Sequence, residues 1–170
     1  GTGREDEMID VNITLSELDT DLSEEIQNLV YIKIDEESGA TLGGGYPVKD
    51  VVIGGVILTG YYEVPKAALT NLALQPAINW HGTIEVTVAA SSIEPTDDFD
   101  GDNIKLSTAS FGVEVEAVAD PADITVLDPV VTGDEDTFIK LPGLAVSLVD
   151  DVETNGPEVL SVVISGMPLD

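Results

Sequence analysis

The chain has 170 residues, 43% of them apolar, and a formal net charge of −27 from 33 acidic and 6 basic residues. It therefore has enough apolar residues to bury a core, but its acidic surface repels nucleic acid and anionic lipid, which excludes both as expected partners. No apolar run approaches the roughly 18 residues that span a bilayer, so no membrane insertion is expected.

The predicted elements are short β-strands separated by turn residues. Residues 83–88 alternate apolar Ile84, Val86 and Val88 with polar side chains, and residues 113–117 repeat this pattern of period two. Only residues 65–72 are expected to be briefly helical. The pattern predicts an antiparallel β-sandwich. Further strands are predicted over residues 8–13, 29–34, 51–58, 72–74, 124–127, 145–148 and 160–164.

The start of the chain recurs 130 positions later. The stretch Gly-Arg-Glu-Asp-Glu-Met-Ile from Gly3 matches Gly-Asp-Glu-Asp-Thr-Phe-Ile from Gly133, and the same offset aligns Leu18 with Leu148. One inserted residue later, Leu29 aligns with Leu160. A period of this size indicates tandem domains, because solenoid repeats run to roughly 20–50 residues. We expect one sandwich over residues 1–128 and the start of a second, incomplete one over residues 129–170. Because the chain starts Gly1-Thr2-Gly3 without a signal peptide, it is expected to be a piece of a longer protein.

These motifs resemble a known family. The series G-x-E-D-x-x-I, then acidic pairs such as Asp150-Asp151, then the L-S-V-V-I-S-G-M-P stretch from Leu160 is similar to the repeats of giant RTX-type bacterial surface adhesins. The resemblance implies an Ig-like (cadherin-like) Greek-key sandwich, serving as an extender repeat whose partners are neighbouring domains of the same polypeptide. It also implies Ca²⁺ at the domain joins. The departures are Glu24-Glu25-Ile26-Gln27, where a short Gly-Ser-Glu turn is usual, and Lys33-Ile34-Asp35-Glu36, where the repeats end I-S-G-x-P.

The residue chemistry agrees with calcium. Ca²⁺ takes six to eight oxygen ligands from carboxylates, carbonyls and water, which suits a chain without cysteine. At the join the candidate ligands are Glu5, Asp6, Asp120, Glu135 and Asp136. The alternative is that these acids only solvate the ends of the domains.

Three further acidic clusters are candidate metal sites. The cluster with Asp98, Asp100 and Asp102 lacks the glycine and glutamate spacing of an EF-hand, but it could form a site at a loop tip or a plain solvated tip. For the other two, the repetition of acids between two predicted strands favours metal-pinned loops over bare polar turns. They contain Asp19 and Asp21 in the first repeat and Asp150 and Asp151 in the second.

Catalysis is not expected. His81 is the only imidazole, and no G-x-S-x-G nucleophile motif occurs. Trp80, with Tyr61 and Tyr62, could bind a sugar or a peptide, although a tryptophan at a strand start more often belongs to a core. The sequence therefore predicts a structural, non-enzymatic extender of an extracellular bacterial adhesin, rigidified by Ca²⁺ and supporting adhesion and biofilm formation. The alternative is a ligand-binding module of such an adhesin.

Overall fold

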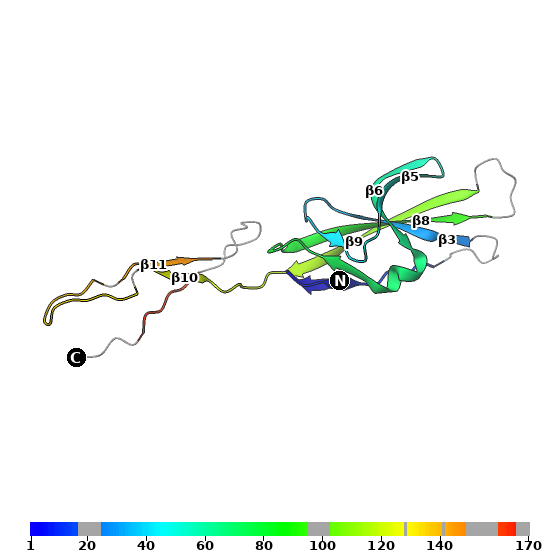
Figure 1. Cartoon of the computed structure of the whole chain (residues 1–170). Helices are drawn as coiled ribbons and strands as arrows, with labels where there is room; N and C mark the ends of the chain where they lie inside the picture. The colour runs from blue at the N-terminus through cyan, green and yellow to red at the C-terminus, as the bar shows by residue number, and fades with distance from the viewer. Residues whose placement is uncertain (17–24, 95–102, 128, 141, 149–159, 166–170) are drawn as a thin grey trace. The chain divides into compact units, whose positions relative to one another are not determined.

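The structure, a computed structural model, describes residues 1–16, 25–94, 103–127, 129–140, 142–148 and 160–165. The described backbone contains eleven strands and one short 3-10 helix, η1 (Lys66–Asn71), so the chain is all-β as predicted. Contacts divide it into unit 1, Gly1–Ala117, and unit 2, Val118–Asp170 (Figure 1). The sequence-based boundary lies later, after residue 128.

Unit 1 contains two sheets. All their strand pairs are antiparallel except β1–β9, which is parallel. The expectation of a purely antiparallel sandwich is therefore wrong for this pair, because β1 and β9 are joined by the whole unit and no tight hairpin fixes their direction. The larger sheet has the order β1 (Thr2–Arg4), β9 (Ile104–Glu116), β8 (Gly82–Ile93), β3 (Glu25–Ile34), β6 (Val56–Pro65), β5 (Val48–Ile53). The smaller has the order β2 (Ile9–Val11), β7 (Leu72–Gln75), β4 (Thr41–Leu42).

The two sheets of unit 1 share one hydrophobic core. Ile9 and Leu74 come from the smaller sheet and Ile32 and Ile84 from the larger, and all four are buried in the same cluster. Along β8, the predicted alternation holds over residues 83–88: apolar side chains are buried and Glu85 is exposed between two of them. Because both sheets contribute inward-facing side chains, unit 1 is a two-layer β-sandwich.

Individual elements differ from the predictions in two places, over residues 51–58 and 160–164. The strand predicted over residues 51–58 is a hairpin of β5 and β6, because Gly54 and Gly55 both adopt positive φ (53° and 79°) and make a two-residue turn. The brief helix expected over residues 65–72 is confirmed as the 3-10 segment η1. Residues 160–164 form no strand, since the described part of unit 2 supplies no partner for them.

Unit 2 contains a two-stranded antiparallel sheet of β10 (Asp123–Val126) and β11 (Leu144–Ser147). None of its described residues belongs to a buried cluster. Ile124 is 63% exposed, and Phe138 is completely exposed. The described part of unit 2 is therefore a small sheet without a core of its own.

Candidate functional site

The acidic turn of unit 1 lies between β1 and β2. Asp6 adopts φ 61°, in the left-handed region, and its Oδ1 accepts a hydrogen bond from the backbone N–H of Asn79 at 3.0 Å. The backbone N–H of Glu5 donates to the carbonyl of Glu116 at 3.1 Å. The turn is thus bound both to the loop that precedes β8 and to the end of β9.

Glu5 is buried and not exposed to solvent. Its residue is 4% exposed, and Oε2 lies 3.7 Å from Nδ1 of His81, whose side chain is also largely buried. A buried carboxylate is stable only beside groups that compensate its lost hydration. The imidazole of His81 lies beside this carboxylate, so the two side chains bring the turn against the loop before β8.

The acidic turn of unit 2 has the same backbone conformation. Asp136 also has φ 61°, and Gly133 faces Ile139 almost as closely as Gly3 faces Ile9. Glu135 and Asp136 are exposed. The motif that recurs in the sequence is therefore a recurring local structure.

The predicted acidic ligands do not gather into one cluster among the described residues. No three Asp, Glu, His or Cys side chains converge in the part of the chain that the structure describes. Glu5 and Asp6 belong to unit 1, whereas Asp120, which is half-buried, belongs to unit 2 with the second turn. Two neighbouring carboxylates fall short of the six to eight oxygens of Ca²⁺, so the acidic turn alone does not make a calcium site. The remaining predicted ligands lie outside the described residues: Asp19, Asp21, Asp98, Asp100, Asp102, Asp150 and Asp151.

The three candidate aromatic residues do not form one surface. Trp80 and Tyr62 are partly buried and pack against the sandwich core, whereas Tyr61 packs against a separate cluster formed by Tyr31 and other residues. Tyr61 and Tyr62 are neighbours in β6, so their side chains point to opposite faces of the sheet.

Burial raises the pKa of Tyr31 above its usual value of 10.0, and the Glu63 carboxylate adds to this effect.

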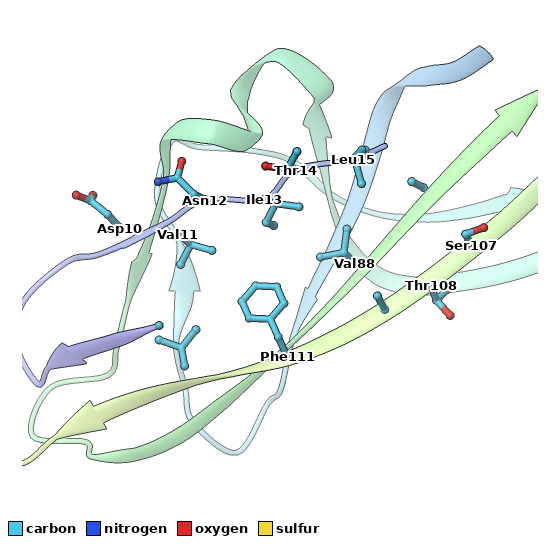
Figure 2. A pocket seen from close by; sticks show the side chains of 14 residues that line it. Asp10, Val11, Asn12, Ile13, Thr14, Leu15, Val88, Ser107, Thr108 and Phe111 are labelled. Atoms are coloured by element: carbon cyan, nitrogen blue, oxygen red, sulfur yellow. The ribbon is translucent and has the colours of Figure 1, made fainter. Parts of the chain in front are cut away.

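The sequence did not predict an apolar groove in unit 1, with a volume of about 470 Å³. Residues 10–15, which include the end of β2, form one wall, and β8 and β9 form the other (Figure 2). Figure 2 shows the ring of Phe111, from β9, between the side chains of Val11 and Val88. The signal available in the sequence was the apolar alternation of residues 9–15, which continues beyond the end of β2.

Comparison of the chain with protein-family models, with curated proteins and with solved structures finds no match. The resemblance to adhesin repeats therefore stays a prediction. Among the described residues, no helix has the length and apolar character needed to cross a bilayer.

Proposed function

We propose that this chain is a structural repeat, an Ig-like β-sandwich extender of an extracellular bacterial adhesin. One observation carries the proposal: the Gly-x-Glu-Asp turn occurs twice with the same backbone, φ 61° at both Asp6 and Asp136. Two copies of one local structure in a single chain are the mark of tandem domains. Domains joined in this way extend a binding tip away from a cell surface.

The strand topology supports an Ig-like arrangement. The start of the chain contributes β1 to the six-stranded sheet and β2 to the smaller sheet, so it crosses from one layer of the sandwich to the other. Strands that switch sheets in this way, and connections between the layers, are features of Greek-key sandwiches. The parallel β1–β9 pair follows from the same crossing.

The proposal places Ca²⁺ at the join between repeats. No three acidic, histidine or cysteine side chains gather among the described residues, which is compatible with ligands contributed from both sides of the join. The candidates on the two sides are Glu5, Asp6, Asp120, Glu135 and Asp136. Bound Ca²⁺ would neutralise part of the net charge of −27. Sites in extracellular modules bind Ca²⁺ at roughly 10⁻⁴–10⁻³ M, which confines such stiffening to the outside of the cell.

The test is thermal unfolding of the whole chain with 10 mM Ca²⁺, with chelator, and with Na⁺ at matched ionic strength. A ligand that binds only the folded state at about 100 times its Kd stabilises by about 2.7 kcal/mol. We expect a rise in Tm that is specific to Ca²⁺. The double variant Glu135→Gln/Asp136→Asn should lose most of the rise, and the exposed control pair Glu36→Gln/Glu37→Gln should keep it. An equal rise with Na⁺ would remove calcium from the proposal.

A ligand-binding module is the alternative function. It requires aromatic side chains that gather on one exposed face, but Trp80 packs against the core and Tyr61 lies on the other face of the sheet from Tyr62. The structure of these residues therefore favours the extender over the alternative.

A further inference from the structure

The groove of unit 1 lies beside two strand edges that have no strand partner within the described residues. On one side, β9 pairs with β1 only from Glu114 to Glu116, which leaves its outer edge over residues 107–111 without a strand. On the other side, residues 12–16 continue beyond β2 but belong to no strand. An apolar groove between two such edges has the shape and chemistry that accept an added β-strand.

The direction of the hydrogen bonds shows which edge of residues 12–16 is open. The backbone N–H of Ile13 donates to the carbonyl of Leu69 in η1 at 2.9 Å. Because successive N–H groups of an extended chain point to opposite sides, the N–H groups of Thr14 and Ser16 point to the other edge. That edge is the one on which a further strand would pair.

Unit 2 contains a strand pair that corresponds to the one proposed for residues 13–16 of unit 1. At an offset of 131, the apolar–polar alternation of Leu144-Ala145-Val146-Ser147 matches that of Ile13-Thr14-Leu15-Ser16. This alignment moves the inserted residue from its first position, after Leu148, to Pro142-Gly143, ahead of β11. In unit 2, these residues form β11 and pair with β10, which precedes the acidic turn. By the offset of the repeat, positions equivalent to β10 would fall before Gly1, and the same pairing does not occur among the described residues of unit 1.

The register of the β10–β11 pair fits the groove. Ile124 lies opposite Val146, and Val126 lies opposite Leu144. In unit 1, Leu15 is the equivalent of Val146 and Ile13 is the equivalent of Leu144. Residues directly opposite in an antiparallel pair share a face, and Ile13 and Leu15 both pack against the core of unit 1. In the equivalent strand of unit 1, the side chains corresponding to Ile124 and Val126 would therefore enter the groove.

We propose that the groove binds an additional β-strand. This strand is supplied in cis, by polypeptide placed directly ahead of Gly1, and it has the alternating polar and β-branched side chains of β10. The strand pairs antiparallel with residues 13–16 and puts two β-branched side chains against Leu15 and Phe111. It adds a fourth strand to the smaller sheet. Each repeat then starts near Val118 or its equivalent, in agreement with the division of contacts after Ala117. The proposal goes beyond the extender function and does not depend on calcium.

The test is a fusion of a second copy of residues 118–130 directly in front of Gly1 of the full chain, which keeps the spacing between β10 and the acidic turn. We expect Tm to rise by about 5 °C or more, since 1 kcal/mol shifts Tm by roughly 2–4 °C for a chain of this size. In hydrogen exchange, the amides of Thr14 and Ser16 should become protected at least about tenfold, while those of β8 stay unchanged.

The control is the same fusion carrying Ile124→Asp and Val126→Asp in the added copy only, which leaves the rest of the chain intact. It should show neither the rise in Tm nor the protection. An equal rise in the control, or no protection of Thr14 and Ser16 in the parent fusion, would overturn the proposal. The mass of the unfused chain in solution tests the source of the strand. A dimer that the fusion converts to a monomer would mean that β10 of a second copy fills the groove, which would overturn the assignment in cis.

Discussion

At the scale of single residues, the acidic turn depends on a glycine. A Cβ at Gly3 would overlap Cγ1 and Cδ1 of Ile9, which is 4% exposed and belongs to the core. Gly133 stands in the same relation to Ile139. The glycine of the motif therefore serves close packing of a side chain across the turn, and its recurrence has a steric reason.

This contact predicts the effect of adding one methyl group. Gly3→Ala should destabilise unit 1 by about 1–3 kcal/mol, the usual cost of overpacking a filled core. The matched control is Gly1→Ala, because a Cβ there would meet only Val113 Cγ1 at 3.9 Å, an ordinary contact. Urea unfolding followed by circular dichroism gives both values. Equal midpoints for the two variants would contradict the steric reason.

At the scale of elements, Asp35 connects β3 to β8. Its Oδ1 accepts from the N–H of Ser38 at 2.8 Å, and its Oδ2 accepts from the N–H of Glu85 at 2.6 Å. The N–H of Asp35 itself donates to the carbonyl of Glu85 at 3.0 Å. One carboxylate thus shapes the loop that follows β3 and extends the pairing of two central strands.

Removal of this carboxylate should loosen the end of the sheet. Asp35→Ala loses two hydrogen bonds to a charged acceptor, and since both lie partly in solvent we expect a loss of about 2 kcal/mol. Glu36→Ala, at the exposed neighbouring position, should change the free energy of unfolding by no more than about 0.5 kcal/mol. Chemical denaturation measures both. A similar loss in the two variants would show that general charge, and not the hydrogen bonds of Asp35, is responsible.

The sequence predicted local features of the fold better than distant ones. The alternation around Ile84 identified β8, and the repeated motif identified both acidic turns. The hairpin was missed because Gly54-Gly55 lies inside an apolar run, whose length and composition resemble a single buried strand. The roles of Asp35 and of the groove depend on partners far away in the chain, such as Glu85 and Phe111, which no local pattern records.

At the scale of the whole molecule, the net charge of −27 opposes folding. Like charges repel one another more in the compact state than in an extended chain. The chain has 6 basic residues against 33 acidic ones, and one of the basic residues, Lys49, lies 2.7 Å from Glu63 in an ion pair. Most of the acidic surface is therefore balanced by mobile cations of the solvent rather than by the protein itself.

This balance predicts a dependence of stability on salt. An increase in NaCl from about 0.01 M to about 0.1 M shortens the screening length from about 30 Å to about 10 Å, so Tm should rise by several degrees. KCl should have the same effect, because screening depends on ionic strength and not on the identity of the cation. Calorimetry at both concentrations checks this. A Tm that falls or stays constant would mean that repulsion between the acidic residues is not a significant term.

The parallel pairing of β1 with β9 has a mechanical consequence. β1 and β9 are the first and the last strand of unit 1 along the sequence. Because they run parallel, Gly1 and Ala117 lie at opposite ends of the strand pair. Tension applied to these two residues therefore pulls the two strands lengthwise past each other. The hydrogen bonds between them, including Glu114 N–H to Gly1 and Glu5 N–H to Glu116, then share the load and break together. When flow stretches the chain, these hydrogen bonds would resist the pull together, as bonds loaded in shear do. In a hairpin at the same place, the hydrogen bonds would break one at a time.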